Sequence, residues 1–187
     1  AKGHYQKVEF QDVIDHIIKN YNYVFKSVQS LSQNTSLIVV TKNQDLDSIN
    51  LLVKANHINF GENRVQEALL KWKNLILINP QLKLYLIGKL QSNKVKDAFE
   101  IFDYIHTLDN EKLAQIFSKL ESTSTKKIKY FIQVNIANEP QKNGISIDKV
   151  NQFIKYCIND LKLNIVGLMC IPPLQGDPSQ YFKNLAE

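Results

Sequence analysis

Cysteine is scarce in this sequence. Its two cysteines, Cys157 and Cys170, are thirteen residues apart, and neither belongs to a CxxC or CxxH pair. This usage argues against a disulfide framework and against a zinc site. It fits a reducing compartment, and we therefore expect a cytoplasmic protein.

Long apolar runs and glycine-rich loops are also missing. No apolar stretch approaches the roughly 20 residues of a transmembrane helix, so we expect no membrane-spanning segment. Neither phosphate-binding fingerprint, GxGxxG or GxxxxGKS/T, occurs in the sequence. This second absence weighs against nucleotide-binding Rossmann and P-loop folds.

Arginine, the residue that most often recognises phosphates and bases, appears once, at Arg64. The net charge of +5 nevertheless raises the possibility of nucleic-acid binding. The lysines that produce this charge are scattered, and their tightest cluster is Lys126, Lys127 and Lys129. We interpret the excess as a solvated basic surface and expect no nucleic-acid partner.

Hydrophobic periodicity supplies the positive evidence for a fold. Apolar residues recur at helical spacing over 8–31, which predicts an N-terminal helix with one broad apolar face. Six predicted strands then alternate with six predicted helices. The strands are 37–41, 57–60, 84–87, 104–108, 130–136 and 165–169, and the helices are 46–55, 63–74, 93–102, 110–120, 147–160 and 178 onward.

The alternation of strands and helices predicts an α/β fold with a parallel sheet. Without the nucleotide fingerprints, a TIM-type (β/α)8 barrel with an extra N-terminal helix is the first choice, built as a single domain over residues 1–187. Such a barrel has eight strands, and six βα units are visible here. We expect the C-terminal strands to be missing from these residues, since the last predicted helix is not followed by a strand.

The carboxyl ends of the strands are where such folds carry their chemistry. Lys42 ends the first predicted strand, either as an ordinary solvated lysine or as a desolvated amine that forms a Schiff base. Asn63 follows the second strand and is either a helix cap or a ligand contact. Ser92 or Asn93 is expected to cap a helix, and His106 to be a structural histidine with its hydrogen bonds satisfied.

Several segments together resemble one family. "IVVTK", "NFGENRVQEAL", "YLIGKLQSNKVK", "FIQVNIANEPQKNGI" and "IVGLMCIPP" occur in the order and spacing of the pyridoxal phosphate homeostasis proteins, over roughly residues 8–187. That family is similar to the N-terminal barrel of alanine racemase, the fold-type III arrangement.

The resemblance implies a cofactor and three site residues. Family members hold pyridoxal 5'-phosphate as an aldimine on the lysine that ends the first strand, which matches Lys42. The asparagine of the "GEN" motif matches Asn63 and is expected to line the cofactor pocket. The lysine of the family's "KSGI" motif matches Lys142, a second amine near the mouth.

Three departures from the family pattern stand out. "NQD" follows Lys42 in place of a proline-containing run, and "KNGI" replaces "KSGI", which puts the larger Asn143 after Lys142. The late serine/glycine segment and the "RIGT" strand end, which hold the cofactor phosphate in the family, do not occur in these residues. These phosphate contacts are therefore not carried over.

The resemblance implies a non-catalytic carrier or regulator in vitamin B6 homeostasis. We expect a monomer that carries no metal and passes its cofactor to PLP-dependent apo-enzymes. A fold-type III enzyme, such as an amino-acid racemase, is the alternative, although no second acid/base group opposite Lys42 is evident. A barrel for another ligand, or a nucleic-acid-associated protein, is the third possibility.

Overall fold

The computed structural model describes the backbone of residues 2–187 and the side chains of residues 11–187. The side chain of Val8, the first apolar position of the predicted N-terminal helix, lies outside the described residues. The α-helices are α1 (Lys2–Leu31), α2 (Leu46–Lys54), α3 (Val65–Ile78), α4 (Val95–Ile101), α5 (Glu111–Ser122), α6 (Val150–Lys155) and α7 (Pro178–Ala186). Short helical turns are η1 (Ser92–Lys94), η2 (Ile147–Lys149) and η3 (Tyr156–Asp160).

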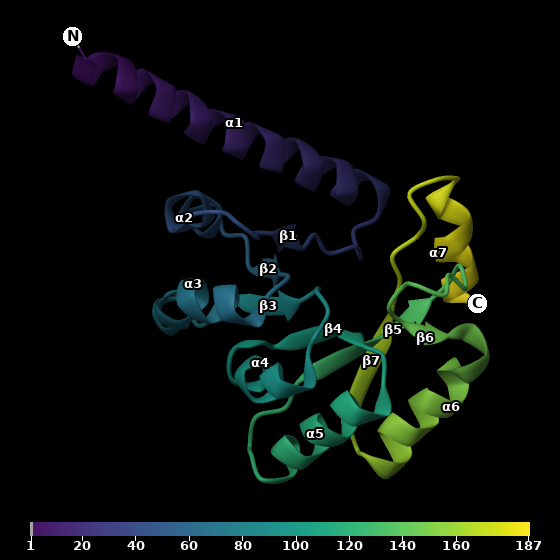
Figure 1. Ribbon diagram of the computed structural model, residues 1–187. Coiled ribbons are helices and arrows are strands. Elements are labelled where there is room, and N and C mark those ends of the chain that lie inside the picture. Colours follow the sequence, from purple (N-terminus) through teal and green to yellow (C-terminus); the bar gives the residue numbers. More distant parts are fainter. Residues whose placement is uncertain (1) are drawn as a thin grey trace.

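The strands are β1 (Val39–Val40), β2 (Asn59–Glu62), β3 (Lys83–Leu86), β4 (Tyr104–Leu108), β5 (Lys129–Asn135), β6 (Ile145–Ser146) and β7 (Asn164–Met169). All pairings are parallel, in the order β1-β2-β3-β4-β5. β7 pairs with residues 129–133 of β5, and β6 pairs with the carboxyl end of the same strand. Among the described strands β1 and β7 do not pair, so the sheet is an open curve with helices α2 to α6 along its outside (Figure 1).

The helix-facing side of the sheet forms the hydrophobic core. Phe60 of β2, Leu84 of β3 and Ile105 of β4 are each 0% exposed. Trp72 of α3 is equally buried, and its ring centroid lies 4.9 Å from that of Phe60. Because full burial of such a side chain stabilises the fold by about 1.5–3 kcal/mol, this layer holds the central strands in place.

The opposite side, which we call the inner face, carries aromatic rings. Tyr85 of β3 stacks on Tyr104 of β4 with ring centroids 4.3 Å apart. His106 meets the Tyr85 ring edge-on, and its own ring lies 4.3 Å from that of Phe131 on β5. The Tyr85 hydroxyl donates a hydrogen bond of 3.0 Å to the side-chain oxygen of Asn59.

Helix α1 crosses one end of the sheet beside α2 (Figure 1). The Tyr21 hydroxyl and His57 Nδ1 are 3.0 Å apart, and His57 Nε2 lies 2.7 Å from the carbonyl oxygen of Asn59. Nε2–H therefore donates to the carbonyl, and Nδ1 accepts from the tyrosine. Burial lowers the pKa of His57, which keeps the ring neutral in this arrangement.

The six predicted βα units are confirmed, and the strand predicted at 104–108 has the observed bounds. The first predicted strand, 37–41, is longer than the two residues of β1, because this edge strand pairs on one side only. The two-residue β6 was not predicted. Asp177 caps α7, and Pro178 lies in its first turn.

Candidate functional site

Lys42 lies two residues after the end of β1, at the carboxyl rim of the sheet. The amide of Thr41 donates to the carbonyl oxygen of Gly61 at 2.9 Å, and Val40 pairs with Gly61. Lys42 and Asn63, each two residues beyond this pair, are therefore neighbours at the rim. The Lys42 side chain is exposed, so this structure does not contain the desolvated amine of the functional interpretation.

Asn63 directly follows β2, and its side-chain oxygen lies in an unusual environment. Its Oδ1 atom is buried and has no hydrogen-bond partner among the described residues. It does not cap α3, whose N-cap is Arg64 and has no side-chain cap bond, so the capping interpretation was wrong. A Cβ at Gly88 would lie 2.1 Å from the Asn63 carbonyl oxygen, so glycine is required where the two loops touch.

A groove of about 530 Å³ begins at Asn63 and runs between the loops after β2 and β3. Arg64, Lys89 and Lys94 supply its charges, and none of the residues that line it is acidic. The N-cap of η1 is Gln91, which makes no side-chain cap bond, and the N-cap of α4 is Lys94. The capping role predicted for Ser92 or Asn93 was therefore wrong.

Lys142 lies apart from the other two predicted site residues. It follows β5, four positions along the sheet from β1, and its Nζ lies 3.0 Å from a carboxylate oxygen of Glu139. It lines a cavity of about 220 Å³ with Asn135 and Ile171 among the other residues. The structure thus brings Lys42 and Asn63 to neighbouring strand ends and leaves Lys142 in a separate cavity.

His106 is not the satisfied histidine that we expected. Its Nε2 atom is buried on the inner face and has no partner among the described residues. Desolvation lowers the pKa of His106 to about 4, so the ring is neutral at pH 7. It lies between Tyr85 and Phe131 rather than in the loops of the rim.

A buried charge cluster behind Lys42 was missed by the sequence reasoning. Glu62 is 0% exposed, and its Oε1 accepts from Thr41 Oγ1 at 2.6 Å and from Trp72 Nε1 at 2.9 Å. Lys71 Nζ lies 2.7 Å from the same oxygen and 2.9 Å from Glu67 Oε1. The signal in the sequence was the i,i+4 pair Glu67–Lys71 on the helix that follows Glu62.

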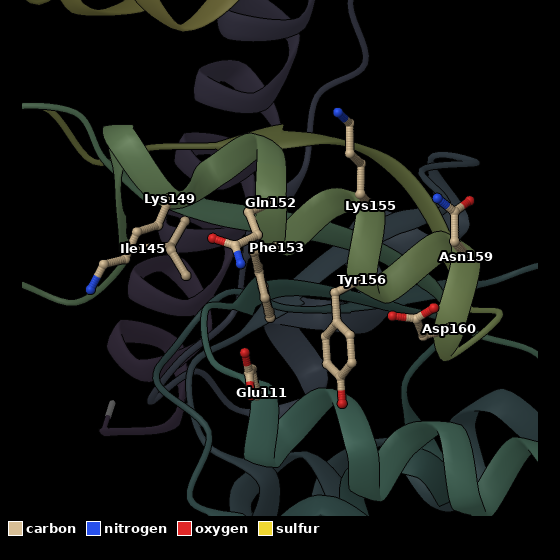
Figure 2. Close-up of a pocket in the computed structure, with 9 residues that line it drawn as sticks. All are labelled: Glu111, Ile145, Lys149, Gln152, Phe153, Lys155, Tyr156, Asn159 and Asp160. Carbon is tan, nitrogen blue, oxygen red and sulfur yellow. The ribbon is translucent and has the colours of Figure 1, made fainter.

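A second groove, of about 540 Å³, lies between α5 and the segment from β6 to η3 (Figure 2). Glu111 faces it from α5, and Phe153 and Tyr156 face it from the other side. The Tyr156 hydroxyl accepts a 2.8 Å hydrogen bond from Gln115 Nε2. None of the predicted site residues lines this groove, so the candidate site remains the rim at β1 and β2.

Residues 11–187 contain no group of three His, Cys, Asp or Glu side chains placed to hold a metal ion. Within the described chain, no helix combines the length and the apolar character that a membrane span requires.

The alanine racemase N-terminal domain family matches residues 14–186. The pyridoxal phosphate homeostasis protein of Buchnera aphidicola from Schizaphis graminum is 34% identical over 168 residues, covering 87% of this chain and 67% of its own. The structure of PipY from Synechococcus elongatus with PLP bound has a TM-score of 0.68 at 30% identity, covering 86% of this chain and 79% of PipY.

Alanine racemase from Bacillus anthracis has a TM-score of 0.66 at 15% identity, over 92% of this chain and 44% of its own, and at this identity the likeness concerns the fold alone. The fold prediction is thereby confirmed as a (β/α)8-type arrangement, of which the described residues form an open portion. With the family match and the relatives above 30% identity, the chain belongs to the pyridoxal phosphate homeostasis protein family, which carries the alanine racemase N-terminal domain.

Proposed function

We propose that this chain binds pyridoxal 5'-phosphate, holds it covalently through Lys42 and acts as a carrier in vitamin B6 homeostasis. The observation that carries the proposal is an exposed lysine amine just beyond β1, beside Asn63, whose buried Oδ1 has no hydrogen-bond partner within the described part of the chain. The names of the relatives and the PLP bound to PipY support this choice of ligand.

The residues at the rim fit such a group. Pyridoxal phosphate supplies an aldehyde, which condenses reversibly with a lysine amine as a C=N bond forms and water leaves. Lys42 offers that amine, and its exposure lets an aldehyde approach. Asn63 Oδ1 offers a hydrogen-bond acceptor that no described residue uses. Lys142 would act as a second amine only after its ion pair with Glu139 breaks.

Carriage without turnover is the second element of the proposal. A racemase needs an acid/base group on the other side of its substrate from the lysine. His106 is a side chain of a type that can serve as an acid or a base, but it is buried among aromatic rings, and its pKa is lowered to about 4. The names of the relatives, which denote homeostasis proteins rather than enzymes, also support carriage.

The carrier role extends to partners. We propose that PLP-dependent apo-enzymes receive the cofactor from a monomeric, cytoplasmic carrier. Reactivation of such an apo-enzyme by the loaded protein, at a rate above that of released cofactor, would support transfer. Sedimentation of the loaded protein at the mass of one chain would support the monomer.

The test uses the whole chain mixed with pyridoxal phosphate. We expect a new absorbance band in the near-violet and, after borohydride reduction, one added cofactor mass on the peptide that contains Lys42. Lys42→Ala removes both signals, whereas Lys54→Ala, at an exposed lysine of α2, retains them. An unchanged adduct in Lys42→Ala overturns the assignment, and Lys42-dependent racemisation of an amino acid overturns carriage without turnover.

A further inference from the structure

Two side chains of α3 hold the backbone on both sides of Lys42. Lys71 Nζ donates to the carbonyl oxygen of Thr41, the residue before Lys42. Glu67 Oε1 accepts from the backbone N–H of Asn43, the residue after it, at 2.6 Å. The peptide groups that flank Lys42 are therefore both bound to one turn of one helix.

The two holding groups are themselves joined. Lys71 Nζ and Glu67 Oε1 are 2.9 Å apart in an i,i+4 pair, and Lys71 also contacts the fully buried Glu62 at 2.7 Å. The side chain of Lys71 is 13% exposed and that of Glu67 is 23% exposed, so water is largely excluded. Lys71 and the N–H of Asn43 together lower the pKa of Glu67, which keeps its carboxylate charged at neutral pH. Hydrogen bonds to charged groups in such surroundings are stronger than neutral ones.

The segment that they hold lies at the edge of the sheet, where β1 ends. β1 contributes two residues to the sheet edge, and Thr41 N–H makes the last ladder bond, to Gly61. The chain then turns, with Gln44 N–H donating to the Thr41 carbonyl at 3.1 Å and Asn43 at φ +58°. A positive φ at the third position of a turn is tolerated by asparagine but costs conformational energy. Lys42 occupies the corner of this turn.

We propose that Glu67 and Lys71 are positioning residues, which fix the turn that presents the Lys42 amine to an aldehyde. The inference rests on the proposed function of Lys42. A loose turn would have to be ordered each time the amine is captured, and this ordering would lower both the rate and the affinity of capture. The pair thus prepares Lys42 without touching the ligand.

Glu67 is the better residue for the test. Removal of Lys71 would leave the carboxylate of Glu62 buried without its charged partner, and such changes destabilise the whole fold. Two substitutions at Glu67 distinguish the effect of its side-chain length, which we call its reach, from the effect of its charge. Glu67→Gln keeps an oxygen at the same distance and loses the charge, whereas Glu67→Asp keeps the charge and shortens the side chain by one methylene.

The measured quantity is the rate and the apparent dissociation constant of the Lys42 adduct with pyridoxal phosphate, followed by absorbance and by borohydride trapping on the Lys42 peptide. We expect Glu67→Asp, which loses the reach, to weaken capture about tenfold. Glu67→Gln, which keeps the reach and loses only the added strength of the charge, should weaken it about threefold. Asn74→Ala, an exposed position of α3, is the control and should change nothing. Ligand-free thermal unfolding establishes that each variant is folded.

The outcomes distinguish a failure of the positioning role of Glu67 and Lys71 from a failure of the proposed role of Lys42. If both Glu67 variants capture the aldehyde like Asn74→Ala, the positioning role is overturned. A loss in Glu67→Gln with full capture in Glu67→Asp also overturns it, because charge rather than reach would then matter. If the unsubstituted chain forms no adduct, or forms it on another lysine, the proposed function itself fails.

Discussion

The two faces of the parallel sheet differ in what covers them. On the helix-facing side, Phe60, Leu84 and Ile105 are completely buried and packed against helices. On the inner face, which the described residues leave open at β1, Val40 is 44% exposed. One face is a buried layer that is apolar apart from the cluster around Glu62, and the other is a partly open surface of rings and polar atoms.

This difference indicates that the helix-facing side mainly stabilises the fold and that the other side carries the atoms that could bind a ligand. A buried polar atom without a partner costs about 1–3 kcal/mol, so such atoms are expected where a ligand or a water molecule completes them. Asn63 Oδ1 lies at the rim and His106 Nε2 on the inner face. Among the side chains that the structure describes, the helix-facing side has one such atom, Glu62 Oε2, on a residue whose other oxygen binds three donors. The inner face and rim are therefore the surfaces available to a ligand.

The largest expected effect lies on the helix-facing side. Trp72→Ala removes a ring that is 0% exposed and one of the donors to Glu62, and we expect a loss of about 3–5 kcal/mol in the free energy of unfolding. Val40→Ala, on the half-open inner face, should cost less than about 1 kcal/mol. Urea unfolding of both variants measures the contrast. Equal losses would contradict the assignment of stability to one face.

The pH dependence of stability tests the inner face. His106 has a folded-state pKa of about 4, below its unfolded value, so its neutral ring contributes stability that is complete above about pH 6.5. As the pH falls from 6.5 to 4, the unfolded state binds the proton first, and about 3 kcal/mol of stability is lost.

His106→Phe isolates this contribution. Phenylalanine keeps an aromatic ring beside Tyr85 and Phe131 but binds no proton. The variant should lose less stability than the unsubstituted chain over the same pH range, as measured by urea unfolding at each pH. His57, whose pKa burial also lowers, remains in both chains and cancels in the difference. Identical pH profiles would mean that His106 is not desolvated.

The sequence predicted the elements whose pattern is local. The strand 104–108 was predicted with its observed bounds, and the placement of Lys42 and Asn63 at the carboxyl ends of their strands followed from the order of strands and helices. β6 escaped prediction because a two-residue pairing has no periodicity. The cluster of Glu62, Lys71 and Trp72 escaped because β2 and α3 meet there only after folding, and composition does not reveal which carboxylate becomes buried.

The smallest expected effect concerns one hydroxyl on the inner face. Tyr85→Phe keeps the ring stacked on Tyr104 but removes the 3.0 Å hydrogen bond to Asn59 Oδ1. Because this oxygen then loses its donor in a half-buried place, we expect a loss of about 1 kcal/mol in the free energy of unfolding. Tyr104→Phe is the matched control, since among the described residues the hydroxyl of Tyr104 makes a long contact of 3.5 Å with Lys129 Nζ, and its loss should cost less than that of the Tyr85 hydroxyl. A larger loss in Tyr104→Phe than in Tyr85→Phe would mean that solvent already satisfies Asn59, and that the inner face is wetter than its ring contacts indicate.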